Sequence, residues 1–377
     1  MGQIVIEHLS KLFPGLAGEQ IRAVDDLNLT VEAGELVTLV GPSGCGKTTT
    51  LRLISGLEEP SSGTVKIAGM LMNGVPAKDR DIAMVYQKPA LFPHLTAREN
   101  IAFGLTLRNC PRAELERRVG EAAEMLELRD CLDRRPSDLS GGQCQRVALG
   151  RAMVRRPKVF LFDEPLANLD PQIRIQLRAE IVRLQKRLEA TVLYVTHDQA
   201  EAMALGNRIA VMNRGTIQQL ATRRELHQLP SNLFIARFVN WPPLNFFECT
   251  LSLQAEQLKF EETGELNRAE PLKMSCPPEV CLTMKNYVGK KVIVGIRPGD
   301  IHYLADSDAK SVEGVIEGNI EMVEPVGEEL YLHARRAGGV VILRGPPQLD
   351  FKINQAIRAR VDMGNALFFA PDTGKAI

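Results

Sequence analysis

The segment from Gly41 to Thr49, Gly-Pro-Ser-Gly-Cys-Gly-Lys-Thr-Thr, constrains the fold of this chain more than any other. It follows an apolar run at residues 35–40 and precedes a helical pattern at 50–55, so it predicts a strand, a glycine-rich loop and a helix in that order. Glycines allow positive φ, which lets successive backbone N–H groups converge on one point at the positive end of the helix dipole. The segment therefore predicts an anion-binding loop in an α/β fold.

The side chains of this loop favour a nucleoside triphosphate as the bound anion. Lys47 would place its ammonium beside the outer phosphates, and Thr48 would offer its hydroxyl to Mg²⁺. Cys45 lies beside Lys47 at the predicted helix N-terminus, where the surroundings favour the thiolate. The structural alternative is a glycine-rich turn that only precedes a helix, but the full eight-position match in its strand-to-helix context favours phosphate binding.

Two acidic residues follow a second apolar run. Residues 158–163 are typical of a central parallel strand buried on both faces, and Asp163 and Glu164 stand at its end. Ligands of open parallel sheets bind at the carboxyl edge, so Asp163 can hold Mg²⁺ while Glu164 faces a water aligned on the terminal phosphorus. The alternative, a pair of helix-capping acids, is weaker because Asp170 offers a better cap for the helix predicted at 172–188.

Three further residues are candidates on one feature each. His197 follows the buried strand predicted at 191–196 and could contact the terminal phosphate at the same sheet edge. Gln87 stands at the end of the strand predicted at 81–86. Phe13 lies on a predicted connection between two short strands, where its ring could stack on adenine, although a core position explains an aromatic residue there equally well.

The pentapeptide Leu-Ser-Gly-Gly-Gln at 139–143 precedes a strong helical pattern and predicts a second helix N-terminus. Ser140 is a good N-cap residue. Gly141 and Gly142 leave the first N–H groups bare, so the helix dipole can support a second anion contact. Capping alone would explain Ser140, but neither two consecutive glycines nor the amide of Gln143. We therefore predict that this segment senses phosphate.

These segments, in this order, resemble the ATP-binding cassette (ABC) family. Residues 41–48 match its phosphate loop, Gln87 its glutamine loop, residues 139–143 its signature and residues 158–163 its second nucleotide motif. The ordered set is highly specific, and the resemblance extends over about the first 235 residues.

The resemblance implies a role for individual residues. Glu164 would be the catalytic carboxylate, His197 the switch histidine and Phe13 the aromatic residue that stacks on adenine. The implied metal ligands are Thr48, Gln87 and Asp163. The implied contacts with ATP held by the same chain are Phe13, Gly41, Pro42, Ser43, Gly44, Cys45, Gly46, Lys47, Thr48, Thr49 and Gln87.

In that family two cassettes pair head to tail, and the signature of one chain closes over the ATP held by the phosphate loop of the other. This chain has one copy of each motif, which implies a homodimer with two shared sites or a heterodimer with a related cassette. The loop 167–170 would cross between subunits. The implied contacts with ATP across the dimer are Ser140, Gly141, Gly142, Gln143 and Asp170.

Three later segments, 232–239, 241–247 and 295–300, are similar to the sugar-importer ATPases of the maltose and glycerol-phosphate type. Trp241 stands where that pattern usually has a small residue. Beyond it, helical periodicity gives way to short strands separated by glycine and proline turns, as at 291–296. The resemblance implies an OB-like β-domain, similar to oligonucleotide-binding folds and used for dimer contacts and regulation.

The predicted fold is an α/β cassette of the P-loop NTPase type at residues 1–238, with a helical subdomain at about 88–155, followed by an all-β OB-like regulatory domain at 239–377. Within the helical subdomain, the proline-containing apolar loop Ala90–Leu95 is typical of a docking surface. The sequence Thr-Ala-Arg-Glu at 96–99 then predicts a capping box at the start of a helix.

Composition narrows the partners and the compartment. Lys plus Arg and Asp plus Glu each number 46, with no concentrated basic stripe, so nucleic acid is not expected as a partner. The seven cysteines form neither a disulfide framework nor a zinc pattern, and they suit a reducing compartment. The first residues indicate a strand rather than a signal peptide, and no apolar stretch approaches the length of a membrane span, so membrane attachment is expected through partners.

The resemblances imply an ATP- and Mg²⁺-dependent ATPase subunit of a bacterial-type importer, which drives uptake of a carbohydrate or related solute by ATP-dependent dimer closure. It would lie peripherally on the cytoplasmic face of the inner membrane, with two permease subunits docked near Ala90–Leu95 and an extracytoplasmic solute-binding protein acting through them. The nearest alternative is a polyamine or metal-oxyanion importer, because those relatives share the β-domain. A soluble non-transport cassette protein would usually carry tandem cassettes or a coiled-coil insertion, and a small-molecule kinase has no need of residues 139–143.

Overall fold

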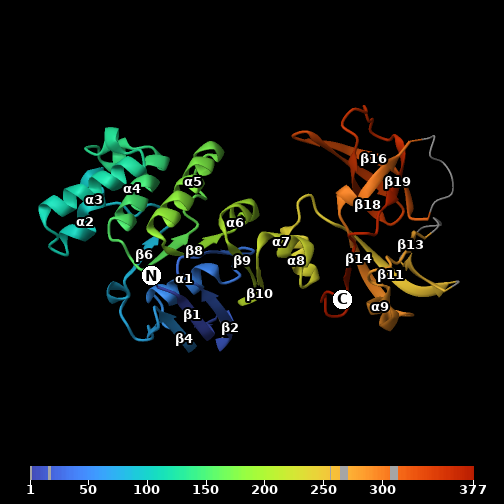
Figure 1. Ribbon diagram of the computed structural model, residues 1–377, viewed down its shortest axis with the longest axis horizontal. Helices are drawn as coiled ribbons and strands as arrows, with labels where there is room; N and C mark the ends of the chain where they lie inside the picture. The colour runs from blue at the N-terminus through green and yellow to red at the C-terminus, as the bar shows by residue number, and fades with distance from the viewer. Residues whose placement is uncertain (1, 16–17, 255, 264–270, 306–312) are drawn as a thin grey trace. The chain divides into compact units, whose positions relative to one another are not determined.

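The computed structural model describes residues 2–15, 18–254, 256–263, 271–305 and 313–377. Contacts divide the chain into two compact units, Met1–Glu225 and Leu226–Ile377. Figure 1 draws the first unit in blue through green and the second in yellow through red. No helix among the described residues has both the length and the apolar character needed to cross a membrane.

The first unit is built on a six-stranded sheet with the strand order β10-β9-β3-β8-β7-β6. Neighbouring strands from β9 to β6 run parallel, and β10 pairs antiparallel with β9 at the edge. Strands β3 and β8 are buried throughout, which explains the continuous apolar runs in the sequence. The strands of this sheet are β3 (Leu36–Val40), β6 (Ile82–Val85), β7 (Val159–Asp163), β8 (Thr191–Thr196), β9 (Arg208–Asn213) and β10 (Thr216–Ala221).

The strand register brings three chain segments to one edge of this sheet. Val40, the last residue of β3, pairs with Thr196, the last residue of β8. Asp163, the last residue of β7, pairs with Val195 of β8. Because these parallel strands end side by side, the residues that follow them lie together at the carboxyl edge, as the sequence predicts.

A second, antiparallel sheet of the first unit has the order β2-β1-β4-β5. Strand β1 contains register shifts and continues to Pro14. Phe13 therefore lies within a strand, opposite Ile21 of β2, and its predicted place on a connection is wrong. The strands of this sheet are β1 (Ile4–Pro14), β2 (Gln20–Val31), β4 (Ser62–Ile67) and β5 (Met70–Leu71).

The helices of the first unit start at recognisable caps. Thr96 caps α2 through a reciprocal capping box with Glu99, as predicted. Asp198 caps α6 by accepting a hydrogen bond from the Glu201 N–H at 3.0 Å. Figure 1 shows α2, α3 and α4 grouped together, away from β1, β2 and β4. The helices are α1 (Lys47–Ser55), α2 (Ala97–Thr106), α3 (Arg112–Met125), α4 (Gly141–Met153), α5 (Pro171–Leu188) and α6 (Gln199–Leu205), with α7 (Arg223–Gln228) at the junction of the two units.

Side chains of the central strands divide between two hydrophobic cores. In β7, Phe160 and Phe162 join the core formed with α2 to α5, whereas Val159 and Leu161 join the core formed with α1, β1, β2 and β4. This alternation is the two-residue period of a strand buried on both faces. The cassette fold and its helical subdomain are thus confirmed.

The second unit combines a five-stranded antiparallel sheet, β13-β12-β11-β14-β20, with a closed barrel, β15-β18-β17-β16-β19 (Figure 1). Apolar side chains from the sheet and the barrel share one hydrophobic core. The predicted all-β domain with a small barrel is therefore confirmed. Its sheet strands are β11 (Asn245–Gln254), β12 (Gln257–Glu262), β13 (Lys273–Ser275), β14 (Lys291–Ile296) and β20 (Leu367–Phe369). Its barrel strands are β15 (Ile301–Leu304), β16 (Val315–Val326), β17 (Glu329–Arg336), β18 (Gly339–Gly345) and β19 (Ala356–Val361), and its helices are α8 (Leu233–Val239) and α9 (Cys281–Met284).

The division between the units falls before α8, at Glu225 and Leu226, and so earlier than the expected boundary at 238/239. Ala236 of α8 is buried together with Ile293 and Phe369 of the second unit. These contacts explain why α8 groups with the β-domain. That a fragment ending at Phe238 folds alone stays a prediction.

Candidate functional site

The glycines of the loop between β3 and α1 are required by close backbone approach. A Cβ on Gly41 would lie 2.1 Å from Met212 O, and one on Gly46 would lie 2.3 Å from Ala23 O. Gly46 is the N-cap of α1 with φ 109°, and it supplies no side-chain cap. The first turn of α1 also contains no acidic residue. The loop therefore presents uncapped N–H groups and an unopposed helix dipole, which favour an anion.

Lys47 is held inside this loop by backbone carbonyls. Its side chain is buried, and Nζ donates hydrogen bonds to Gly41 O at 2.8 Å and Pro42 O at 2.9 Å. An ammonium has three donors, so it can hold these two carbonyls and still bind a phosphate oxygen. A point charge on a flexible stem suits that position.

Cys45 differs from the sequence-based expectation. The residue is only 4% exposed, and burial raises the pKa of its thiol although Lys47 acts in the opposite direction. Desolvation of the thiolate outweighs the nearby ammonium. The prediction of a reactive thiolate at Cys45 is therefore wrong.

A carboxylate and a hydroxyl meet at the end of β7. Thr48 Oγ1 donates a hydrogen bond to Asp163 Oδ1 at 3.1 Å. Burial, and then the neighbouring charge of Glu164, raise the pKa of Asp163. A desolvated carboxylate beside a hydroxyl is a donor set that Mg²⁺ prefers, and a cation would offset the uncompensated charge. Gln87 is exposed beyond β6, and within the described chain it forms no hydrogen bond with either residue.

Glu164 and His197 are paired across the ends of neighbouring strands. Glu164 Oε2 lies 2.8 Å from His197 Nδ1, and the Glu164 N–H donates to Val195 O at 2.9 Å. Glu164 has φ 47°, a left-handed conformation that is costly for a residue with a Cβ. The structure thus holds this carboxylate in a strained turn against an exposed imidazole. A helix-capping role does not account for that geometry.

A buried hydrogen-bond network that the sequence reasoning missed fixes the turn carrying His197. Tyr194 Oη donates to the Glu201 carboxylate, and Thr196 Oγ1 donates to Glu201 Oε2 at 2.9 Å. The Asp198 N–H donates to Thr196 Oγ1 at 3.0 Å. Burial raises the pKa of Glu201. The available sequence signal was the Tyr194 hydroxyl, because a phenol in a buried strand needs a polar partner.

Capping and packing explain more of the residues at the start of α4 than the sequence predicts. Ser140 Oγ accepts from the Gln143 N–H at 3.2 Å, and Gln143 Oε1 accepts from the Ser140 N–H at 3.0 Å. A Cβ on Gly142 would lie 3.0 Å from Ile173 Cγ2 of α5. The prediction that capping does not explain the Gln143 side-chain amide is therefore wrong, since Gln143 completes a capping box. Gly141 stays exposed, with no close neighbour to exclude a side chain.

Asp170 occupies the N-cap position of α5, but its side chain makes no capping hydrogen bond. The backbone carbonyl of Asp170 accepts from the Arg174 N–H at 3.0 Å, and Pro171 fills the first helical position. The prediction that the Asp170 side chain caps α5 is therefore wrong. The carboxylate is exposed at the surface of the unit.

Phe13 is half-buried in β1, with the Lys11 ammonium 5.0 Å from its ring centroid. Lys11 is itself tied to the Glu58 carboxylate at 2.6 Å. The ring is therefore not a core side chain. A cationic neighbour over the face is favourable for an aromatic ring.

The loop Ala90–Leu95 is fixed from within. Arg151 Nη1 donates to Ala90 O at 2.6 Å, and Asn100 Nδ2 donates to the carbonyls of Phe92 and Leu95, each at 3.1 Å. The Phe92 ring packs on Phe103 with centroids 4.4 Å apart. The apolar side chains of this loop thus turn partly inward, and Ala90, Pro93 and His94 are its exposed residues.

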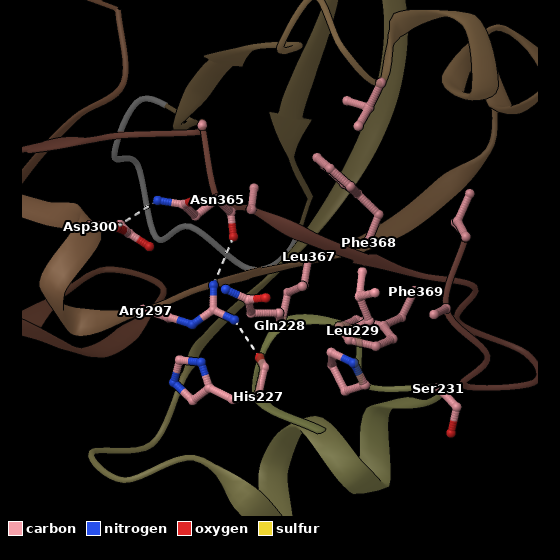
Figure 2. Close-up of a pocket in the computed structure, with 16 residues that line it drawn as sticks. His227, Gln228, Leu229, Ser231, Arg297, Asp300, Asn365, Leu367, Phe368 and Phe369 are labelled. Atoms are coloured by element: carbon pink, nitrogen blue, oxygen red, sulfur yellow. Dashed lines mark hydrogen bonds between the residues drawn. The ribbon is translucent and has the colours of Figure 1, made fainter. Parts of the chain in front are cut away.

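The second unit contains a cavity of about 640 Å³, drawn in Figure 2. Arg297 Nη1 donates to Asn365 O at 3.0 Å and Nη2 to His227 O at 2.6 Å, while Asn365 Nδ2 lies 3.4 Å from Asp300 Oδ1. Burial lowers the pKa of Arg297. The segment 295–300, which the resemblance singled out, therefore ties together the walls of this cavity.

Comparison with known proteins gives concordant matches. The profile of the ABC transporter family matches residues 24–167. The chain is 45% identical to the trehalose/maltose import ATP-binding protein MalK of Thermococcus litoralis, over 95% of this chain and 96% of that protein. It is 43% identical to the oligosaccharides import ATP-binding protein MsmX of Bacillus subtilis, over 99% of both chains. It is 47% identical to the trehalose import ATP-binding protein SugC of Mycobacterium tuberculosis, over 88% of this chain and 82% of that protein.

A solved structure matches part of the chain. The ATP-binding cassette MJ0796, as a dimer in a post-hydrolysis state bound to ADP and Pi, aligns with a TM-score of 0.52 and 31% sequence identity. The alignment covers 58% of this chain and 98% of that one. The remainder of this chain has the sequence relatives above as its counterparts.

Proposed function

This chain belongs to the ABC transporter family as the ATP-binding subunit of an importer, and from that premise we propose that it hydrolyses ATP at a shared dimer site to drive uptake of a carbohydrate or related solute. One observation supports the proposed chemistry most strongly. The phosphate loop, the Asp163–Glu164 pair and His197 follow three parallel strands that end side by side. Ligands of such sheets bind at that edge.

In the proposed mechanism, Lys47 and the uncapped N–H groups of α1 bind and orient the terminal phosphates of ATP. Glu164 Oε2 orients and polarises the attacking water, and it can accept a proton as the water adds to phosphorus. His197 holds the Glu164 carboxylate through the 2.8 Å contact and faces the terminal phosphate. The other ATP contacts proposed within the chain are Phe13, Gly41, Pro42, Ser43, Gly44, Cys45, Gly46, Thr48, Thr49 and Gln87.

Magnesium is proposed as the second ligand of this site. Thr48 and Asp163 would hold it, with Gln87 approaching as the site closes. When bound, the ion supplies positive charge against the phosphate oxygens. The raised pKa of Asp163 supports the assignment, because a desolvated carboxylate is stabilised by a cation.

The proposed dimer completes the site from a second chain. Ser140 and Gly141 are exposed at the start of α4, and the Asp170 carboxylate is exposed at the start of α5. A head-to-tail pair would place these groups, with Gly142 and Gln143, against the ATP of the partner. The similarity to a cassette solved as a dimer supports this arrangement, and the single set of motifs is compatible with a homodimer or a related partner cassette.

The proposed importer assigns the loop Ala90–Leu95 to two membrane permeases. Its fixed backbone and its exposed Pro93 and His94 are suited to docking, and the chain would then lie peripherally on the cytoplasmic face of the membrane. A solute-binding protein would act through the permeases. The relatives named for maltose, trehalose and oligosaccharide import favour a carbohydrate over the polyamine or oxyanion alternative and over a soluble cassette.

The proposed cassette comprises residues 1–238 and the regulatory β-domain residues 239–377. Fragments ending at Glu225 and at Phe238 test this boundary, because α8 distinguishes them. If α8 belongs to the cassette, the longer fragment should bind ATP and unfold cooperatively, and the shorter one should be less stable. If α8 needs its contacts with Ile293 and Phe369, the two fragments should have the same Tm.

Uptake by living cells tests the proposed function. Deleting the gene for this chain from its host should abolish uptake of labelled maltose, trehalose or a longer oligosaccharide. The wild-type gene should restore that uptake, while the Glu164→Gln gene, expressed to the same level, should not. Unchanged carbohydrate uptake with lost polyamine or oxyanion uptake would select the alternative importer, and unchanged uptake of all three would refute import.

A further inference from the structure

Two of the seven cysteines share one turn in the second unit. Cys276 follows β13, and Cys281 begins α9. Between them the Val280 N–H donates to Pro277 O at 3.2 Å, and the Cys281 N–H donates to Pro278 O at 3.4 Å. These consecutive turns lead into α9, and the two prolines restrict the backbone of the turn. The turn therefore brings the two thiols to the same side.

The two thiols converge on one carbonyl group. Cys281 Sγ lies 3.2 Å from Pro277 O and 3.7 Å from Cys276 O. Cys276 Sγ lies 3.7 Å from the same Pro277 O. Both residues are half-buried, so a small reagent can reach them while the surrounding core holds them in place.

Their environment also separates the two thiols chemically. Burial, and then the hydrogen bond with the Cys281 thiol, raise the pKa of Cys276 to about 12. Because the thiolate is the nucleophile, this raised pKa slows attack by the Cys276 thiol.

The other cysteines share no acceptor of this kind, although Cys131 and Cys144 interact electrostatically. Cys45 and Cys249 are buried. The Cys131 thiol donates to Leu128 O and the Cys144 thiol to Pro136 O, so these two have separate acceptors. Among the seven cysteines, all of which lie in the described part of the chain, only Cys276 and Cys281 converge on one carbonyl oxygen.

We propose that Cys276 and Cys281 are a redox-responsive modification site, a dithiol that hydrogen peroxide converts into an intramolecular disulfide. The Cys281 thiolate attacks one peroxide oxygen and breaks the O–O bond, which gives a sulfenic acid and, after protonation, water. Cys276 sulfur then attacks the Cys281 sulfur and displaces its hydroxyl as a second water. One peroxide is reduced and two thiols are oxidised, so the step yields one disulfide and two waters.

Closure of the disulfide would act on the cavity of Figure 2, because Val280 lies within the turn and lines that cavity. The bridge would restrain the turn between β13 and α9. A modification of two side chains could therefore fix one wall of a large cavity in the β-domain.

The test uses the full-length wild-type chain, treated with increasing hydrogen peroxide, alkylated, and digested without reduction. Trypsin should release residues 274–285 as one peptide, lighter by about 2 Da and carrying no alkyl group when the disulfide has formed. A second digestion at Glu279 cuts between the two cysteines, and the two products should stay linked until a reductant is added. At micromolar protein, this closure should be about 10³-fold faster than any intermolecular link through half-buried Cys110, because a short loop gives millimolar effective concentration.

Single variants provide matched controls. Cys276→Ser and Cys281→Ser should each abolish the linked product, while Cys110→Ser should leave it unchanged. In Cys276→Ser, a sulfenic acid should be trapped by dimedone on Cys281. The proposal is overturned if wild-type peptide 274–285 keeps two alkylatable thiols after peroxide has oxidised exposed methionines, or if either cysteine links to a different cysteine instead.

Discussion

The helices α1 and α4 both begin at glycine-containing segments without an acidic residue in the first turn, but their N-termini are built in opposite ways. α1 begins after Gly46, which offers no side-chain cap, and the buried Lys47 ammonium lies beside it. α4 begins after Ser140, whose capping box with Gln143 satisfies part of the terminus, and Gly141 is exposed. In the proposed site, the first terminus binds the anion within one chain, and the second adds contacts to an anion held by the partner chain.

Among the variants that test this comparison, Glu164→Gln should have the largest effect on ATP turnover. The change keeps the shape of the side chain and removes the carboxylate that we propose faces the attacking water. Turnover should fall by about 10²–10⁴-fold, the usual contribution of a positioned acid–base group, while ATP binding survives. Uncleaved ATP should then bridge the α1 terminus of one chain and the α4 terminus of the other. Size exclusion should show a dimer that depends on ATP.

The matched control for that experiment is His197→Gln, which removes the partner of the Glu164 carboxylate without removing the carboxylate itself. It should slow turnover less than Glu164→Gln does if His197 acts by holding Glu164. Near-normal hydrolysis by Glu164→Gln, or loss of ATP binding without a change in association, would remove Glu164 from the catalytic role.

Lys47→Ala and Ser140→Ala should differ in their effect on the ATP affinity of a single chain. The variant loses a charged donor to the outer phosphates, so ATP affinity should fall by about 10²-fold, which corresponds to about 2.7 kcal/mol. Ser140→Ala should leave the affinity of the monomer unchanged, because that residue would meet only the partner's nucleotide. Titration with a fluorescent ATP analogue at a concentration below dimerisation measures both values. Equal losses in the two variants would mean that the termini act in the same chain.

The sequence predicted the strand, the glycine loop and the helix of the α1 terminus, because these three features are all local. The close approach of Gly41 and Gly46 to Met212 O and Ala23 O, however, comes from segments far away in the chain. Desolvation is equally non-local, which is why the expected Cys45 thiolate was wrong. The local motif indicated that a glycine is needed at position 46, but it could not predict the close backbone approach or the desolvation of Cys45.

The α4 terminus and the β-domain show the opposite limit. Gly142 is explained by Ile173 of α5, and Gln143 by its own helix, so two residues attributed to phosphate sensing have structural causes as well. In the second unit, strand alternation predicted individual strands such as β14, but not which strands close the barrel. Pairing between distant strands is set by packing and not by any local motif.

The glycines of α4 offer a smaller test. In Gly142→Ala, the new Cβ would lie 3.0 Å from Ile173 Cγ2, so the Ile173 side chain must move by a few tenths of an ångström. Overpacking should exceed the gain in helix propensity, and the free energy of unfolding should fall by about 1–2 kcal/mol. In Gly141→Ala, the nearest side-chain atom would be 3.7 Å away, so stability should not fall. Urea denaturation compares the two variants, and a larger loss for Gly141→Ala would contradict the packing explanation.

The smallest expected effect is on stability, and it comes from the capping residues of α2 and α4. Comparing the two helices tests whether the α4 terminus is only a cap or also contacts ATP. Thr96 and Ser140 each form a reciprocal capping box, with Glu99 and Gln143 respectively. Thr96→Ala and Ser140→Ala should therefore each lower the free energy of unfolding by about 1 kcal/mol, which urea denaturation can resolve. Their effects on association should differ. In a Glu164→Gln background, Ser140→Ala should weaken the ATP-dependent dimer, whereas Thr96→Ala should leave it unchanged, because no ATP contact is assigned to α2. If both variants weakened the dimer equally, the loss would follow from helix stability alone, and the α4 terminus would be a capped helix start with no contact to the partner's ATP.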